Sequence, residues 1–313
     1  MVVGSGVVGL TCAVRLLEAG HRVDVLARDR PLETTSSVAA ALWYPYRALP
    51  VERVTGWAAR SFEVFRALAK QPKTGVAMVA GTELFRAKQP DPWWASAGPV
   101  LERVSPDPPY VDGWSFVAPV VEMPVYLRWL GRRLEDGGGT LTRMALSGLP
   151  TGAHAAQGDV VVNAAGLGAR LLAADPTLQP VRGQVVHVSQ IGLTRWWLDS
   201  SGPDGGPPVY VVPRSHDIVV GGTDEEGSWD RRPDPSAASA ILARASHLVP
   251  ALAEARPLGS RVGLRPVRPT VRLELERPAG TEAAVVHCYG HGGAGVTLSW
   301  GCAEEVAELV AKA

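Results

Sequence analysis

Cysteine is scarce in this sequence, and long apolar runs are missing. Three of the 313 residues are cysteines, Cys12, Cys288 and Cys302, and no two of them stand in a CxxC pair. Three thiols at this spacing exclude a disulfide framework and zinc ribbons or fingers, so we expect reduced thiols. No apolar run reaches the ~18 residues that a membrane-spanning helix needs. We therefore expect no membrane partner and a cytoplasmic location.

A net charge of either sign is also missing. The chain has 31 basic and 31 acidic side chains, and hydrophobic residues make up 46% of it. This balance excludes a disordered chain and an electrostatic binder of nucleic acid. The 313 residues are enough for two domains or for one large α/β unit with an inserted lobe.

The first motif in the sequence is a glycine-rich turn near the N-terminus. Residues 1–27 have the pattern of a strand, a turn with Gly4, Gly6 and Gly9, an apolar helix and a second strand. Glycine is needed there for a tight turn, for close approach of a pyrophosphate to the backbone, and for contact between helix and strand. In this context the turn predicts dinucleotide binding rather than only a sharp turn in an α/β core.

The identity of the dinucleotide depends on the end of the second strand. An acidic residue at that position usually holds the adenosine ribose, and Asp29 is the candidate. Arg28 could contact a phosphate or the adenine, and a preference for NADP remains an alternative. An NAD(P)-linked dehydrogenase, or a nucleotide-binding protein without catalysis, would share the same turn.

A second glycine-rich segment, residues 289–297, precedes the last helix of the chain. Gly292, Gly293 and Gly295 lie between a predicted buried strand and that helix. Such a loop offers backbone N–H groups and a helix N-terminus to a negatively polarised ligand atom. The N1/C2 carbonyl region of a flavin matches this site, whereas a flexible connector is the alternative interpretation.

The rest of the chain alternates between helical and strand patterns. Helices are predicted at residues 52–69, 125–135 and 237–248, and a hairpin at residues 209–222. A buried strand at residues 159–166 runs into a small-residue turn, which is typical of a sheet edge that a ligand approaches. Two discontinuous domains, interleaved in sequence, explain this order most simply.

Together these motifs resemble the D-amino-acid oxidase family of FAD enzymes over nearly the whole chain. The resemblance rests on an ordered set of segments: residues 4–9, 34–46, 182–184, 210–213, 263–269, 289–297 and 300–302. It implies an α/β fold (α+β overall) with a Rossmann-type FAD-binding domain and an interleaved substrate domain on a large mixed or antiparallel sheet. The FAD-binding domain would comprise 1–50, 134–183 and 265–313, and the substrate-binding domain 51–133 and 184–264.

The same resemblance assigns the substrate contacts. The carboxylate-binding arginine of the family falls on Arg265, its active-site tyrosine on Tyr210, and the backbone carbonyl that holds the amine on Gly293. Arginine suits this role because its planar fork makes two parallel charge-assisted bonds to a carboxylate. Arg268 should point to the opposite face of an extended segment, together with Arg272 and Glu274, and serve a salt-bridged structural role.

Cofactor contacts are implied along several segments of the chain. They fall on Gly4, Gly6, Gly9, Arg28, Asp29, Thr35, Ser36, Ala40, Ala41, Leu42, Met144, Gly166, Gly292, Gly295, Val296 and Thr297. Two features depart from the family pattern. The base and acid at positions 28 and 29 are in reversed order, and Tyr44 replaces a glutamine.

The implied activity is oxidative deamination of neutral D-amino acids to 2-oxo acids, ammonia and hydrogen peroxide. Hydride passes from the substrate Cα to flavin N5, dioxygen reoxidises the flavin, and no side chain acts as acid or base. A D-aspartate oxidase is an alternative and would need a second cation, for which Arg214 is the candidate. Glycine or sarcosine oxidation is a further alternative, and a homodimer is left open.

Histidine and tryptophan offer weaker functional interpretations. His287, Cys288 and His291 suggest a metal site, but histidines four residues apart converge only on a helix, and the neighbouring glycines argue against one. We therefore predict no metal, and we disfavour His291 as a catalytic base. The Trp93–Trp94 and Trp196–Trp197 pairs are expected in the core or in an interface.

Overall fold

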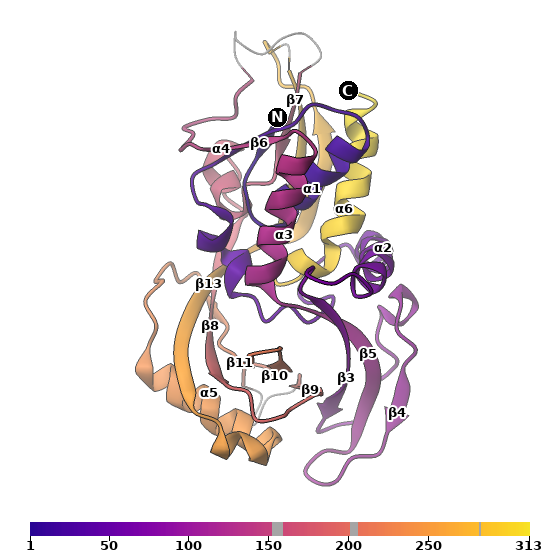
Figure 1. The fold of residues 1–313 in the computed structure, drawn as a ribbon, viewed down its shortest axis with the longest axis vertical. Helices are drawn as coiled ribbons and strands as arrows, with labels where there is room; N and C mark the ends of the chain where they lie inside the picture. Colours follow the sequence, from indigo (N-terminus) through magenta and orange to yellow (C-terminus); the bar gives the residue numbers. More distant parts are fainter. Residues whose placement is uncertain (152–158, 201–205, 282) are drawn as a thin grey trace.

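The computed structural model describes residues 1–151, 159–200, 206–281 and 283–313, and these form one large mixed sheet with helices packed against it (Figure 1). The sheet has fourteen strands, thirteen of which follow the order β4-β5-β3-β9-β10-β11-β8-β13-β14-β7-β1-β2-β6, while β12 pairs with β8. The predicted α/β class with a large mixed sheet is confirmed.

The parallel half of the sheet is the upper part of Figure 1. Its strands are β1 (Val2–Val3), β2 (Asp24–Ala27), β6 (Thr140–Arg143), β7 (Val160–Asn163) and β14 (Ala284–His291). Helices α1 (Val7–Glu18), α3 (Met123–Asp136) and α6 (Gly295–Val310) cover one side, and α1 packs against both of the others. The strands are rich in valine because helices and loops bury them.

The other half of the sheet is mainly antiparallel. Its strands are β3 (Val76–Phe85), β4 (Glu102–Val104), β5 (Asp112–Val121), β8 (Gln179–Ser189), β9 (Trp196–Asp199), β10 (Val209–Pro213), β11 (Asp217–Gly221), β12 (Glu225–Glu226) and β13 (Pro257–Glu276). Helix α5 (Pro235–Leu248) packs on β8, β10 and β11, α2 (Val51–Leu68) packs on α6, and α4 (Ala169–Leu172) is a single turn. The predicted helices and the 209–222 hairpin are therefore present.

Strand β13 joins the two halves, because it pairs with β8 through its first half and with β14 through its second. The ladder with β14 shifts register between Val267 and Arg272, where Pro269 cannot donate a backbone hydrogen bond. The sequence predicted an extended segment only at residues 265–269, and the strand is much longer. Arg265 consequently lies at the junction of the two halves.

The glycine turn before α1 is explained by atoms that leave no room for a side chain. Gly4 has φ +116°, and a Cβ on it would lie 2.4 Å from the carbonyl oxygen of Ala164. A Cβ on Gly9 would lie 2.0 Å from the carbonyl oxygen of Gly4. Helix α1 ends at Glu18, and Gly20, two residues later, has a φ of +87° that allows the chain to turn away from the helix. The predicted strand–turn–helix–strand order is thus present.

The C-terminal glycine segment is shorter than predicted. Strand β14 continues to His291 because β13 pairs with it as far as that residue, so only residues 292–294 remain as a turn before α6.

The tryptophan pairs differ from the prediction in one residue. Trp94 and Trp196 are fully buried, whereas Trp93 is exposed. None of the described helices is long and apolar enough to cross a membrane.

Candidate active site

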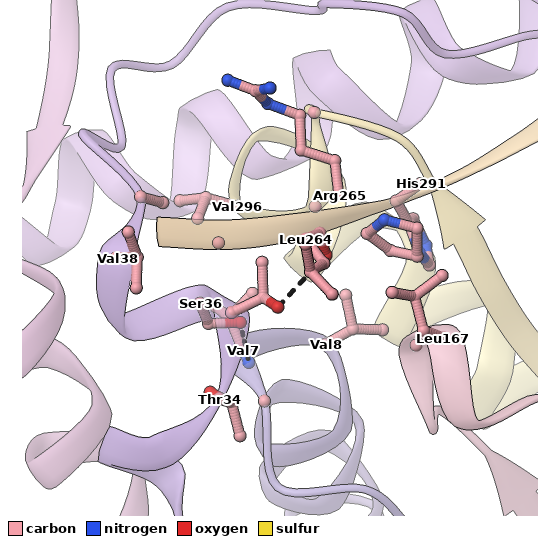
Figure 2. Close-up of a pocket in the computed structure, with 18 of the residues that line it drawn as sticks. Val7, Val8, Thr34, Ser36, Val38, Leu167, Leu264, Arg265, His291 and Val296 are labelled. Carbon is pink, nitrogen blue, oxygen red and sulfur yellow. Dashed lines mark hydrogen bonds between the residues drawn. The ribbon is translucent and has the colours of Figure 1, made fainter. Parts of the chain in front are cut away.

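A cavity of about 1020 Å³ lies between the two halves of the sheet. Its lining comes from the β1–α1 turn, the end of β2, the segment that includes residues 33–46, strand β13 and the start of α6. Figure 2 shows Val7, Val8, Ser36, Val38, Leu264 and Val296 from these elements around one space. This volume is at the upper end of what ligand pockets have, which suits a large cofactor together with a small substrate.

Nearly all of the site residues predicted from the sequence line this one cavity. They are Gly6, Arg28, Asp29, Thr35, Ser36, Ala40, Ala41, Leu42, Met144, Gly166, Tyr210, Arg265, Gly292, Gly293, Gly295, Val296 and Thr297. Gly4 and Gly9 do not line it; they allow the close packing of the turn described above. Residues far apart in sequence are therefore brought together.

The N-terminus of α1 opens onto the cavity through Gly6, Val7 and Val8. A Cβ on Gly6 would lie 3.1 Å from Oγ of Ser36, so the backbone is left accessible there. Ser36 accepts a hydrogen bond from the Val7 amide at 3.0 Å, and no acidic side chain lies in the first turn of the helix. The positive end of the helix dipole is thus available to an anion such as a pyrophosphate.

One end of the cavity carries a pair of opposite charges. Arg28 Nη2 lies 2.7 Å from Asp29 Oδ2, and the Arg28 hydrogen bond holds the pKa of Asp29 below its usual value. The carboxylate therefore stays ionised and can accept hydrogen bonds from ribose hydroxyls. Glu33 and Arg231 also line this end, and the sequence analysis did not find them.

A second helix N-terminus, that of α6, borders the cavity through Gly295, Val296 and Thr297. The turn before it is held firmly: Thr297 Oγ1 is 3.1 Å from both the amide nitrogen and the carbonyl oxygen of Tyr44. A Cβ on Gly292 would lie 2.4 Å from the carbonyl oxygen of Arg47. These contacts do not fit a flexible connector, and they leave backbone N–H groups for a polarised carbonyl.

Arg265 lies at the other end of the cavity, with 19% of its side chain exposed. Its Nη1 donates to the carbonyl oxygen of Thr223 at 3.1 Å and lies 3.4 Å from Oδ1 of Asp224. A Cβ on Gly183 would lie 2.5 Å from the same nitrogen, so glycine makes room for the guanidinium. Gly293 is beside it, since a Cβ there would lie 3.7 Å from Arg265 Cδ.

Tyr210 packs next to Arg265 against two glycines. A Cβ on Gly221 would lie 2.0 Å from Cζ of Tyr210, and one on Gly222 would lie 2.8 Å from its hydroxyl. Burial raises the pKa of Tyr210, and a hydrogen bond with Arg265 opposes that rise. The tyrosine is therefore neutral and can still donate its proton in a hydrogen bond.

The structure adds two lining residues, Tyr46 and Asp224, to this end of the cavity. The Tyr46 hydroxyl donates to Asp224 Oδ2 at 3.0 Å, and Arg47 lies 2.9 Å from the same oxygen. Sequence analysis missed Asp224, although its place just after the predicted hairpin strand that pairs with Tyr210 could have indicated it.

Two other arginines lie outside the cavity lining. Arg268 forms an ion pair with Asp175 at 2.8 Å, which agrees with the predicted structural role. Glu274, which was expected on the same face, pairs with Arg272 instead. Arg214 donates to the carbonyl oxygen of Ala39 at 2.8 Å, and burial lowers its pKa. Neither residue is among those that line the cavity.

The three cysteines meet in the core beside His291. The ligand atoms of Cys288, His291 and Cys302 all lie within 4.8 Å of one another. Cys12 forms a hydrogen bond with Cys288, and all three cysteines are free thiols. Burial raises the pKa of Cys302 and lowers that of His291 to about 4, so we expect protonated, unreactive thiols beside a neutral imidazole. His287 is not part of this cluster, because its Nε2 lies 2.9 Å from Oε2 of Glu276.

Comparison with known proteins agrees with this geometry. A family model described as FAD dependent oxidoreductase matches residues 1–309. The chain belongs to this FAD dependent oxidoreductase family. The resemblance predicted from the sequence is thereby confirmed, and an NAD(P)-linked dehydrogenase is set aside.

Several relatives of this flavoprotein match over almost their whole length. The D-amino-acid oxidase of Rubrobacter xylanophilus is 53% identical over 100% of this chain and 96% of its own. The D-amino-acid oxidase of Streptomyces coelicolor is 44% identical over 99% and 95%, and the human D-aspartate oxidase is 36% identical over 99% and 94%. Glycine oxidase from Geobacillus kaustophilus shares the fold, with a TM-score of 0.82 at 22% identity over 99% and 94%.

The residues around the cavity fit FAD. The N-terminus of α1 can hold the pyrophosphate, Asp29 the ribose, and the N-terminus of α6 the carbonyl edge of the flavin. The close backbone approach that the cofactor needs is preserved at Gly6 and Gly292, where a side chain would meet Ser36 or Arg47. This oxidoreductase therefore uses FAD.

Proposed function

We propose that the protein oxidises D-amino acids to 2-oxo acids, ammonia and hydrogen peroxide, with dioxygen as electron acceptor. The observation that carries the proposal is the guanidinium of Arg265 beside Tyr210 and Gly293, at the opposite end of an FAD-sized cavity from Asp29. The two bacterial relatives named D-amino-acid oxidase support the same reaction.

The side chains bind and orient the substrate rather than exchange protons with it. Arg265 would hold the α-carboxylate through two charge-assisted hydrogen bonds, and Tyr210 would donate a third. The Gly293 carbonyl would accept from the substrate amine. Bound FAD supplies the hydride acceptor and, once reduced, the reactant for dioxygen. Holding the carboxylate and amine together fixes the direction of the Cα–H bond, and such positioning accounts for a large part of the rate.

Neutral substrates are favoured by the charges at this end. Asp224 is an acid, and Arg265 is taken by the α-carboxylate. A D-aspartate side chain would need a second cation, and Arg214 lies outside the cavity lining with Ala39 as its partner. Oxidation of D-aspartate is the second candidate activity, because the human relative that is 36% identical is named D-aspartate oxidase. Glycine or sarcosine oxidation, the homodimer, the cytoplasmic location and the two discontinuous domains stay predictions.

The proposal is tested by visible spectroscopy of the purified holoenzyme. Under anaerobic conditions D-alanine or D-methionine should abolish the flavin absorbance, because hydride transfer reduces the bound cofactor. L-Alanine should leave the spectrum unchanged, and D-aspartate should act much more slowly. Reduction by NADPH alone, with no response to any D-amino acid, would refute the proposal.

A substitution outside the substrate contacts tests the position of Arg265. Gly183→Ala places a methyl group 2.5 Å from Nη1 of Arg265, so the guanidinium must move while the rest of the strand stays in place. We expect KM for D-alanine to rise by roughly tenfold or more, with little change in FAD content. An unchanged KM would show that the carboxylate binds elsewhere. Steady-state kinetics and the flavin-to-protein absorbance ratio measure the two quantities.

A further inference from the structure

Glu83 is a buried acid to which the proposed reaction gives no role. It lies in β3, 1% exposed, and its Oε1 accepts hydrogen bonds from the hydroxyls of Tyr44, at 2.8 Å, and of Ser200. Among the described residues no cation pairs with it, and burial raises its pKa to about 7. A carboxyl group in this setting is expensive to bury, and such groups concentrate at functional sites.

The strand register places Glu83 on the same face of the sheet as Tyr210. Glu83 lies opposite Leu198 of β9, and Leu198 lies opposite Tyr210 of β10. Residues opposite one another in adjacent strands point to the same face, and two strand spacings correspond to about 10 Å. Leu198, Tyr44 and Ser200 all line the cavity. Glu83 therefore contacts the cavity lining through Tyr44 and Ser200.

Arg265 is the guanidinium that faces the cavity at this end, and the proposed reaction assigns it to the α-carboxylate. Asp224 already lies 3.4 Å from it. The other cations near this end already have partners: Arg47 pairs with Asp224 and Glu226, and Arg214 donates to the carbonyl oxygen of Ala39. Glu83 adds a second acid on the wall beyond Tyr210, and its two hydrogen-bond donors, Tyr44 and Ser200, are uncharged.

We propose that Glu83, with Tyr44 and Ser200, forms a charge-selective wall of the subsite for the substrate side chain. This wall accepts neutral and cationic D-amino acids and excludes those whose side chain ends in a carboxylate. The inference rests on the proposed oxidation of D-amino acids and names the substrate class of the same site.

The selectivity should depend on pH because the wall repels an anion only while Glu83 is ionised. The neighbouring hydroxyls do not ionise in this range, since burial raises the pKa of Tyr44, Tyr46 and Tyr210 above 10. Asp199, paired with Arg86, and Arg195, beside Thr82, lie on the opposite face of the sheet. On the same face as Glu83, Asp112 of β5 is paired with Arg103 of β4 at 2.6 Å. Among the charged residues that line the cavity, Asp224 and Arg265 lie at the substrate end; Arg47, paired with Asp224, and Arg214, bonded to the Ala39 carbonyl, are the charges next to them.

The test compares two substrates of nearly equal shape, D-asparagine and D-aspartate, with the holoenzyme. Two like charges about 10 Å apart, at an effective dielectric constant of about 20, change affinity by roughly tenfold. We expect the ratio of kcat/KM for D-asparagine over D-aspartate to fall about tenfold in Glu83→Gln at about pH 8.5, and much less at about pH 6. Comparing variant with wild type at each pH cancels the ionisation of the substrates themselves.

Two further variants complete the experiment. Glu102→Gln removes an exposed acid from β4, two strands away from Glu83, and should leave the ratio as in the wild type. Tyr44→Phe removes a donor to the carboxylate, so the pH at which the ratio changes should move upward. This second readout serves if Glu83→Gln does not fold.

Two failures can be told apart. A wild-type enzyme that oxidises D-alanine, with a ratio unaffected by Glu83→Gln and a pH midpoint unaffected by Tyr44→Phe, would overturn the role of Glu83 alone. No oxidation of any D-amino acid would overturn the proposed function as well.

Discussion

Arg265→Ala should lower kcat/KM for D-alanine by roughly 10²- to 10⁴-fold while FAD remains bound. The substitution removes the cation that faces the cavity beside Tyr210 and Gly293, and it leaves the substrate carboxylate without a charged partner. The cofactor should stay because the contacts we propose for it are with the N-termini of α1 and α6 and with Asp29. Stopped-flow reduction and steady-state kinetics, with the flavin spectrum as the measure of cofactor content, give both results.

Arg268→Ala is the matched control for this experiment. Arg268 lies three residues along the same strand, outside the cavity lining, where its Nε is 2.8 Å from Oδ2 of Asp175. Its removal should leave KM unchanged and lower the melting temperature, because the buried carboxylate of Asp175 loses its ion-pair partner. Near-normal turnover of Arg265→Ala would contradict the assignment of the carboxylate site.

Gly9→Ala is expected to abolish FAD binding. The added Cβ would lie 2.0 Å from the carbonyl oxygen of Gly4, and neither the turn nor the start of α1 has space to move. The turn that presents Gly6 and the helix N-terminus to the pyrophosphate would therefore be displaced. We expect colourless or aggregated protein, judged by the flavin absorbance and by circular dichroism.

Gly56→Ala provides the comparison within another helix. Gly56 is an exposed residue of α2, and a Cβ there would meet no atom within 4 Å. The same chemical change should keep FAD bound and stabilise the protein by about 0.5–1 kcal/mol, since alanine favours the helix more than glycine does. Equal behaviour of the two variants would mean that packing at Gly9 does not hold the cofactor turn.

Local patterns were sufficient for the elements that form from consecutive residues. The helix after the turn, and the contact of Gly9 with Gly4, depend on residues close in sequence, although Gly4 also packs against Ala164. Both the turn and the helix were predicted. The Arg265-Pro266 pair was correctly expected to be extended, because proline restricts the residue before it. The extent of β13 and β14 was underestimated, because each is prolonged by pairing with the other across the sheet.

The sequence alone was sufficient to predict the glycine turn before α1, the family and the extended Arg265-Pro266 segment, because the residues of each motif are contiguous in the chain. Only the tertiary structure decided that Tyr44 and Ser200 enclose Glu83, that Asp224 lies beside Arg265, and that three distant cysteines meet at His291. The partners of Glu83 are 39 and 117 residues away in the chain. The ionisation of a buried acid depends on which distant groups exclude water from it and donate to it, and chain folding alone brings those groups together.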